Sequence, residues 1–282
     1  MSPRFFVKRL SALLCLCGMM LSPALQAVHQ PKWELGVGVG ALSAPSYRGS
    51  DTRTEFAIPF PYVIYRGSFL RVDRESGVRG KLFSGEDLRF DLSLAGSLPV
   101  RDTDDGARSG MDELDPLIEL GAELSIDLWR SPERDHRFGF NIPLRMVFSV
   151  GDPLLEDQGL TLSPYFNYRI WREEEAALTR YSLSVGPIFA TRRYHDYFYE
   201  VAPEFVTPER PEYNPSSGYS GSRVTLSVTR HFRQYLIGAF ARYDSLDGAV
   251  FEDSPLVETT DYLAVGVVFG WILGTSSTQV EH

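Results

Sequence analysis

Residues 118–128 read Ile-Glu-Leu-Gly-Ala-Glu-Leu-Ser-Ile-Asp-Leu, so every even-numbered residue is apolar and every odd-numbered residue is polar or glycine. The apolar residues resume at every second position from Phe138 to Val150. A period of two is that of an extended strand with one apolar face. Each run is about twice the usual five or six residues of a strand and matches the roughly 9–11 residues with which a tilted strand crosses a bilayer. The pattern predicts a membrane barrel with lipid against the even-numbered face.

Residues 1–27 have the pattern of a cleaved export signal. Three basic residues precede a short apolar stretch over 10–21, and Leu25-Gln26-Ala27 suits cleavage. The apolar stretch is well short of the about 20 residues that a membrane anchor helix needs. We therefore expect residues 28–282 to be the mature protein, a single β-barrel domain in the outer membrane of a Gram-negative bacterium.

Both cysteines, Cys15 and Cys17, lie in this signal, so the expected mature chain has no disulfide, thiolate metal site or cysteine nucleophile. It keeps 25 basic residues against 37 acidic ones, a net charge of −12. An acidic exported protein has no electrostatic basis for binding nucleic acid. No later segment is long enough for a membrane helix, as expected where only alternate residues face lipid. A soluble β-sandwich is the alternative explanation of the alternation alone.

The fold predicted is all-β, a transmembrane antiparallel β-barrel of twelve strands. An even count returns both chain ends to the periplasmic side. Ten strands is the alternative, if the proline-containing segments 54–65 or 196–206 pair poorly. The predicted strands are 33–43, 54–65, 68–82, 87–98, 116–130, 137–150, 159–171, 179–190, 196–206, 219–230, 234–244 and 262–272.

The four tryptophans lie at predicted strand ends, where amphipathic rings mark the membrane interfaces. With twelve strands, Trp33 and Trp271 fall at the periplasmic rim, and Trp129 and Trp171 at the outer rim. The same count places the long acidic segment 99–115 on the periplasmic side, where turns are normally short. Either the count is wrong by one before this segment, or the barrel has an unusual inner loop.

No residue pattern predicts catalysis. The nearest approach to a nucleophile elbow is Gly218-Tyr219-Ser220-Gly221-Ser222, which lacks the closing glycine and a following helix. The acidic residues before Gly106 fit a calcium-binding loop only in half of its positions, and a solvated turn explains them better. We predict no enzyme, no cofactor and no metal site. An embedded lipid hydrolase is the least favoured alternative.

Charged residues on the polar faces of the strands are predicted to point into the barrel, where opposite charges can pair. Structural pairing is favoured, because side chains can largely fill a lumen of this size. A narrow, charge-selective channel is the alternative. The residues concerned are Arg89, Asp91, Glu119, Glu123, Asp127, Arg145, Arg169, Arg223 and Arg242.

Several motifs that follow one another along the chain carry a family resemblance. They are Leu35-Gly36-Val37-Gly38-Val39-Gly40, Pro45-Ser46-Tyr47-Arg48-Gly49-Ser50-Asp51, Pro59-Phe60-Pro61-Tyr62, Gly110-Met111-Asp112-Glu113-Leu114-Asp115-Pro116, Glu212-Tyr213-Asn214-Pro215 and Asp253-Ser254-Pro255-Leu256-Val257. The chain resembles the MltA-interacting protein (MipA)/OmpV family of outer-membrane barrels. The resemblance implies a scaffold that brings a lytic transglycosylase together with a bifunctional penicillin-binding protein during cell-wall growth. Other members are discussed as adhesins, which would act through the outer loops. The family has no catalytic residues to transfer.

Two further expectations concern surfaces. The last predicted strand carries Gly266, Phe269 and Trp271 in the spacing of an outer-membrane assembly signal, although Ala264 and the extra tail 272–282 depart from it. The candidate partner-binding loop is the segment 99–115, chosen for its length and its acidic residues Asp102, Asp104, Asp105, Asp112 and Glu113. Outer-membrane lipid is the other expected partner.

Overall fold

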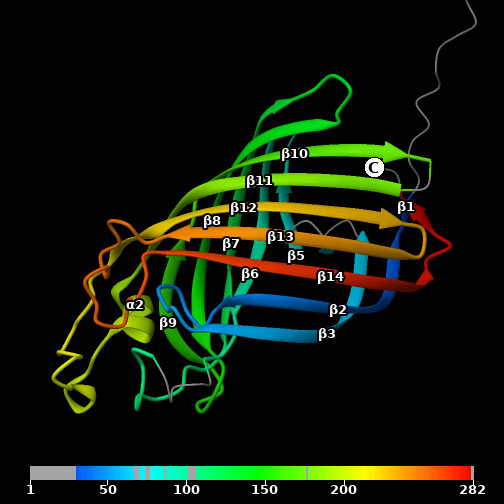
Figure 1. Ribbon diagram of the computed structural model, residues 1–282. Coiled ribbons are helices and arrows are strands. Elements are labelled where there is room, and N and C mark those ends of the chain that lie inside the picture. The colour runs from blue at the N-terminus through cyan, green and yellow to red at the C-terminus, as the bar shows by residue number, and fades with distance from the viewer. Residues whose placement is uncertain are drawn as a thin grey trace, which may run out of the picture.

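Thirteen antiparallel strands form one sheet that closes on itself (Figure 1). The computed structural model describes residues 30–66, 70–73, 77–85, 87–100, 106–175 and 177–280. The sheet closes because β8 pairs with β10 at one place and β9 pairs with β11 at another. The predicted all-β, antiparallel barrel is therefore confirmed.

The element bounds show how long the wall strands are, most of them between 10 and 15 residues. The barrel strands are β2 (Trp33–Pro45), β3 (Arg53–Arg66), β4 (Leu70–Asp73), β5 (Gly77–Ser84), β6 (Leu88–Ser97), β7 (Leu117–Arg130), β8 (His136–Ser149), β9 (Glu156–Leu162), β10 (Tyr165–Glu174), β11 (Ala177–Ala190), β12 (Gly218–Phe232), β13 (Tyr235–Ser245) and β14 (Asp261–Thr275). A short helix α2 (Arg192–Tyr199) and a 3-10 turn η1 (Pro203–Phe205) lie between β11 and β12. A separate pair joins β1 (Gln30–Pro31) to β15 (Gln279–Val280).

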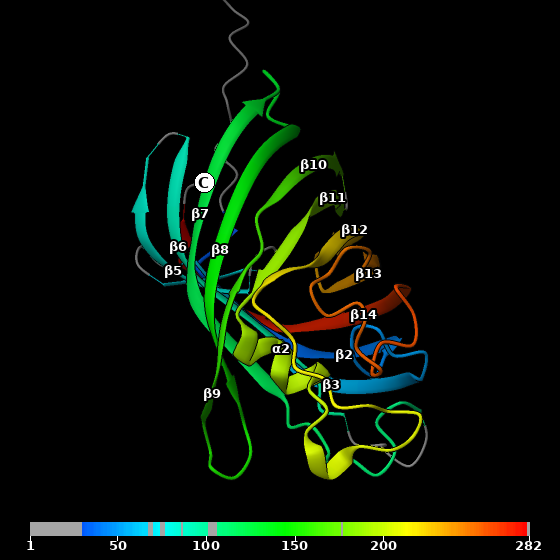
Figure 2. The same ribbon diagram turned by 90° about the vertical axis from the view of Figure 1, so that its left-hand side faces the viewer.

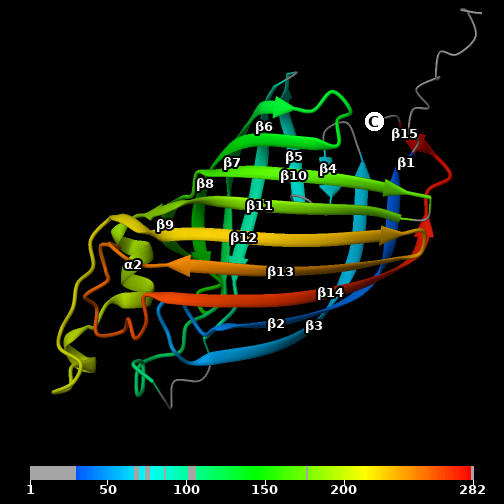
Figure 3. The same ribbon diagram turned by 45° about the horizontal axis from the view of Figure 1, so that its top comes forward.

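Long connections gather at one end of the barrel and short turns at the other. In Figures 1 and 3, α2 and the long loops lie at the left, whereas β1, the turn between β12 and β13 and the end of β14 lie at the right. We call these the loop end and the turn end. Because both described chain ends lie at the turn end, it is the periplasmic end in the usual orientation of such barrels.

Three predicted strands are wrong in detail, and the sheet has thirteen strands instead of twelve. The segment 68–82 contains a hairpin of two short strands, β4 and β5. The segment 159–171 contains β9 and β10, which meet at Ser163-Pro164 and both pair with β8. The segment 196–206 is no strand, because residues 192–199 form a helix. Tyr194 and Phe198 lie four residues apart on one face of this helix and pack against the hydrophobic cluster formed by the long loops.

The additional β4–β5 hairpin explains the conflict over the acidic segment. It adds one crossing before β6, so residues 98–116 leave β6 at the loop end. There the Glu258 carboxylate accepts hydrogen bonds from the Ala107 and Asp51 N–H groups at 2.9 and 3.2 Å. The predicted periplasmic position of 99–115 is therefore wrong, and the miscounted strand is the reason.

The same correction applies to two aromatic residues. Trp129 and Trp171 lie near the ends of β7 and β10, which run from the loop end to the turn end. They therefore lie at the same end as Trp33 and Trp271, and their predicted position at the outer rim is wrong.

The lipid-facing surface follows the predicted parity. Ile118, Leu120, Leu144 and Met146 are 45–51% exposed on the outside of the barrel, whereas Ser125 on the opposite face is 1% exposed. These side chains lie on strands of 14 residues each, long enough to cross a bilayer. Among the residues that the structure describes, no helix has the length and hydrophobicity to span a membrane.

Glycines on the inner face allow large apolar side chains to lie against the wall. A Cβ atom built on Gly38 would lie 2.3 Å from the Phe60 ring, and one on Gly266 would lie 2.4 Å from the Phe240 ring. Across these glycines an apolar group assembles, which we call the inner apolar cluster. It consists of Phe60, Tyr62, Ile64, Leu236, Val268 and Ile272.

Candidate functional site

The long loops pack into a cap over the loop end of the barrel. We define the loop cap as residues 46–52, 106–116, 191–217 and 246–260. Figure 2, which faces the loop end, shows α2 among these segments and within the outline of the strands. The core of the cap joins residues from every one of them to β7 and β8, and its fully buried members include Tyr199, Leu246, Phe251 and Val147. The loop end is therefore covered by a hydrophobic core.

Aromatic residues of α2 hold the cap together. The rings of Tyr199 and Phe251 stack with centroids 3.7 Å apart and an interplanar angle of 10°. The Tyr199 hydroxyl donates a 2.8 Å hydrogen bond to the Arg48 carbonyl, and the Tyr47 hydroxyl donates one of 2.7 Å to the Leu256 carbonyl. Burial raises the pKa of both tyrosines above the ordinary value, so both hydroxyls remain donors.

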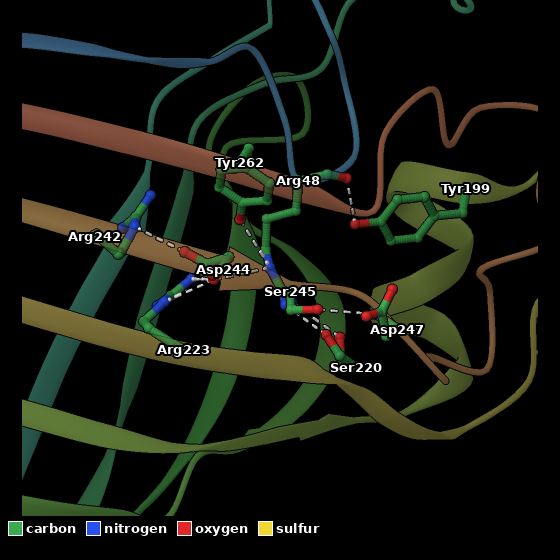
Figure 4. A network of polar contacts seen from close by, with 9 residues as sticks. All are labelled: Arg48, Tyr199, Ser220, Arg223, Arg242, Asp244, Ser245, Asp247 and Tyr262. Atoms are coloured by element: carbon green, nitrogen blue, oxygen red, sulfur yellow. Dashed lines mark hydrogen bonds and ion pairs between the residues drawn. The ribbon is translucent and has the colours of Figure 1, made fainter.

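A polar network lies between the cap and the lumen (Figure 4). The Asp244 side chain, fully buried, meets Arg223 at 2.8 Å, Arg242 at 3.2 Å and Arg48 at 3.5 Å. Arg48 also donates to the Ser220 carbonyl at 2.5 Å and to the Tyr262 hydroxyl at 3.2 Å. Three guanidinium groups therefore share one carboxylate, and Arg48 ties the loop after β2 to β12, β13 and β14.

His195 in α2 is enclosed by the cap and has no exposed surface. Its Nδ1 lies 2.7 Å from the Ser216 carbonyl, so Nδ1 carries the proton and donates. Burial lowers the pKa of His195, and the positive charge of Arg48 acts in the same direction. The closed cap therefore holds a neutral imidazole.

Of the predicted partner-binding residues, the structure describes Asp112 and Glu113. Asp112 and Glu113 are exposed on the loop cap, and neither side chain enters the Arg48–Asp244 network. Asp102, Asp104 and Asp105 lie outside the described residues. The loop cap lies at the end opposite to the described chain ends.

Most of the predicted interior charges are paired. Asp127 accepts from Arg89 at 2.9 Å and from Arg130 at 2.5 Å, and it also pairs with Arg137. Arg145 lies 3.6 Å from Glu119 and 4.0 Å from Glu123. These contacts favour the structural interpretation of the lumen charges. A cavity of about 360 Å³ remains in the lumen, lined by Asn167, Arg169, Arg180, Ser182, Ser184, Ser227 and Thr229 among others.

The serine of the partial nucleophile elbow has a structural partner. The Ser220 hydroxyl accepts a 3.1 Å hydrogen bond from Arg48, and the side chain is fully buried. Among the described residues, no group of three His, Cys, Asp or Glu side chains converges as metal ligands. These contacts offer no support for a hydrolase.

Three residues that organise the loop end were not predicted as site residues from the sequence, namely Arg48, Asp244 and Tyr199. Asp244 continues the inward parity of Arg242 on the same strand, which is a signal that could have found it. Arg48 lies in a quoted family motif but outside any predicted strand. Tyr199 lay in a segment predicted as a strand, so its position in α2 could not be anticipated.

The assembly-signal residues occupy the closing strand. Phe269 and Trp271 are 45% and 54% exposed on the outer face of β14, and Gly266 faces inward beneath Phe240. β14 pairs with β2 from Val265 to Thr275, which joins the last barrel strand to the first. Part of the tail that follows forms β15, which pairs with β1.

Residues 37–273 match the family described as "MltA-interacting protein MipA". The chain belongs to the MipA family. This match covers all the barrel strands and the loop cap except the first residues of β2 and the end of β14. Together with the barrel and its apolar outer surface, membership places the protein in the outer membrane. Residues 1–27, the predicted export signal, lie outside the described residues.

Several solved structures bear a distant likeness to this MipA-family chain. A structure titled "CymD monoaromatic hydrocarbon channel" is 11% identical, covering 91% of this chain and 92% of that one, with a TM-score of 0.34. "Bacterial polysaccharide outer membrane secretin" is 10% identical, with coverage of 85% and 97% and a TM-score of 0.35. OprD from Pseudomonas aeruginosa is 8% identical, with coverage of 91% and 97% and a TM-score of 0.27. No curated protein matches the sequence.

Proposed function

We propose that this MipA-family barrel is a non-enzymatic scaffold that docks a lytic transglycosylase, and with it a bifunctional penicillin-binding protein, on the periplasmic side of the outer membrane. The observation that carries the proposal is the closed loop cap. Its hydrophobic core covers the loop end, which favours a role in binding over one in free passage of solutes. The family description supports the choice of a transglycosylase as partner.

The docking surface proposed from the fold is the turn end, because the enzymes concerned act in the periplasm. The turn between β7 and β8 is a preorganised feature there. The Ser131 hydroxyl donates to Asp135 at 2.8 Å, and Asp135 also pairs with Arg172 on β10 at 3.3 Å. These contacts hold the exposed side chains of Glu133 and Arg134 in a rigid turn. A rigid turn loses little conformational entropy when a partner binds.

The experiment is a pull-down of the transglycosylase with detergent-solubilised barrel. The double variant Glu133→Ala/Arg134→Ala should lower the amount recovered several-fold, because it removes the exposed charges of the turn. The matched control Asp112→Asn/Glu113→Gln changes two exposed charges at the loop end and should leave recovery unchanged. If only the control variant lost binding, docking at the turn end would be refuted and the acidic segment would be supported as the docking site.

The acidic segment itself supports a second candidate function, that of a surface adhesin. Asp112 and Glu113 are exposed at the loop end, and Asp102, Asp104 and Asp105 precede them in the same connection. This placement fits a ligand on the cell surface. Cells carrying the Asp112→Asn/Glu113→Gln variant should then bind host surfaces less well, with unchanged recovery of the transglycosylase.

The alternative of a narrow channel predicts ion conductance in planar bilayers. The packed cap favours a closed state for the wild-type protein. Steady conductance of the wild-type barrel would support the channel and weaken the scaffold proposal.

A further inference from the structure

The barrel wall is incomplete between β3 and β6, along nearly all of β3 and along the loop-end half of β6. β3 pairs with β2 along its length, from Arg53 to Tyr65, but with β4 only at Tyr65 and Arg66. β6 pairs with β7 from Leu88 to Ser97, but with β5 only from Arg89 to Asp91. Within the described residues, no strand pairs with the other edge of β3 from residue 53 to residue 64. We call this interval the seam; in Figure 3, β3 is the lowest strand of the wall that includes β14 and β2.

The sequence of β3 is suited to an unpaired edge. Pro59 and Pro61 lie two residues apart and so share one orientation along the strand. Proline is tolerated in a sheet where its missing N–H would face the unpaired side. Opposite Val39 and Val37 of β2, both prolines therefore turn the side without a donor toward the seam. Prolines at an edge also oppose the addition of another strand.

The inner face of β3 beside the seam is apolar, which is unusual for a barrel lumen. Phe56, Ile58 and Phe60 share the inward parity of Tyr62, whose hydroxyl donates to the inward Glu34 at 3.1 Å. Ile58 remains 41% exposed although it faces the lumen, so open space adjoins it. The outer face carries Ala57, Pro59, Pro61 and Val63, so the strand is apolar on both sides.

The apolar surface continues deeper into the barrel. Phe60 belongs to the inner apolar cluster, which reaches across β2 to Val268 on β14 and Leu236 on β13. The close approach depends on glycines, since a Cβ on Gly38 would collide with Phe60. A continuous apolar track therefore runs from the outer face of β3, past its unpaired edge, to the inner wall.

We propose that the seam is a lateral portal, and that the acyl chain of an outer-membrane phospholipid enters it and lies against Phe56, Ile58 and Phe60. The remaining carbonyl groups of the β3 edge must meet water, because unpaired backbone groups are costly in hydrocarbon. An amphipathic lipid suits both surfaces, with its chain on the apolar track and its head group at the hydrated edge. The occupant is taken from the bilayer that already covers the outer face of the same strand.

The test uses fluorophore-labelled single-cysteine variants of the mature barrel, since no cysteine follows Cys17. Ile58→Cys places a nitrobenzoxadiazole label at the seam, Val37→Cys places it on the lipid face, and Ser227→Cys places it on the far inner wall. Each variant is reconstituted into phosphatidylcholine vesicles with or without bromine atoms on the acyl chains. Quenching at Ile58→Cys should approach that at Val37→Cys and exceed that at Ser227→Cys several-fold. Quenching no greater than at Ser227→Cys would overturn the proposal.

A second measurement guards against a label that disturbs the wall. A photoreactive benzoylphenylalanine at position 58, in barrels whose gel mobility still shifts on boiling, should form an adduct with phospholipid that mass spectrometry identifies. The same residue at position 227 should form none. Adducts only with another part of the chain, or only with a second protein, would show that the seam is filled by polypeptide and would refute a lipid portal.

Discussion

Replacement of Asp244 by asparagine tests whether the polar network holds the loop cap on the barrel. The Asp244→Asn substitution would keep the volume of the side chain and remove its charge. The guanidinium groups of Arg48, Arg223 and Arg242 would then face one another without the carboxylate that lies 2.8–3.5 Å from them. We expect the cap to open more often while the strands remain closed.

The size of the effect follows from burial. Loss of one partner from a buried ion pair typically costs about 3–5 kcal/mol, since the remaining charge is left uncompensated. Asp244 has no exposed surface, but the arginine side chains keep 13–35% of theirs, so water can compensate part of the loss. The lower end, about 3 kcal/mol, is therefore expected. It corresponds to a roughly hundredfold larger population of the open cap.

Limited trypsin digestion of reconstituted barrels measures this population, because cleavage of a transiently open segment follows the opening equilibrium. Arg192 and Arg193 in the cap supply cleavage sites. Asp247→Asn is the matched control, since Asp247 is exposed on the loop that follows Asp244. All four tryptophans lie at the turn end, so their fluorescence should remain that of the wild type.

A second change separates loss of charge balance from loss of packing. In the Asp244→Asn background, Arg242→Gln removes one uncompensated charge and should restore part of the protease resistance. If Asp244→Asn were cleaved no faster than Asp247→Asn, the network would not be what holds the cap on the barrel.

Four further predictions concern other parts of the barrel. Burial lowers the pKa of His195 below its ordinary value, so the closed cap binds fewer protons than the open cap. The stability of the closed cap should therefore be complete above about pH 6.5 and should fall as the pH drops below that value. Trypsin digestion across this range should show the dependence in the wild type and not in His195→Gln. Tyr199→Phe removes the hydrogen bond to the Arg48 carbonyl and should destabilise the cap by about 1 kcal/mol in the same assay. The stability of the barrel strands should not change. Gly38→Ala should displace Phe60, destabilise the barrel by about 1–3 kcal/mol and so lower the temperature of the gel-mobility shift. Gly40→Ala should leave that temperature unchanged, because the atom nearest to its new Cβ would lie 3.8 Å away. Equal shifts for the two variants would contradict the packing of the inner apolar cluster. Leu144→Arg on the lipid face should cost about 2–4 kcal/mol in urea-dependent unfolding from bilayers, and a neutral result would argue that Leu144 does not face hydrocarbon.

The alternation in residues 118–150 was sufficient to predict the class of fold and the face turned to lipid. Alternate side chains of a strand point to the same face of the sheet, so the apolar face and the length of the strand can be read directly from the sequence. Pairing of opposite charges inside the barrel also followed from parity, whereas the individual pairs, such as Arg89 with Asp127 and Arg145 with Glu119, came only from the structure. Family membership could be predicted from motifs spread along the chain, and the match over residues 37–273 confirmed it.

Strand number and the order of the ends could not be predicted in the same way. One short hairpin at residues 70–84 reverses the predicted direction of the strands from β6 to β11, and nothing local distinguishes that hairpin from one longer strand. The absence of a strand at 196–206 restores the predicted direction of β12, β13 and β14. The acidic segment and two tryptophans were consequently placed at the wrong ends. The helix α2 was read as a strand because its aromatic residues are so closely spaced that both periods fit them.

Sequence by itself determined the barrel, its lipid-facing residues and its family, because each of these depends on local periodicity or on motifs along the chain. Tertiary structure decided the loop cap, the Arg48–Asp244 network and the seam. These features bring together residues as far apart as Arg48 and Tyr262, which are separated by 214 positions, or depend on which strand edges find a partner. Such contacts are set by the closure of the whole sheet, and no local pattern encodes them.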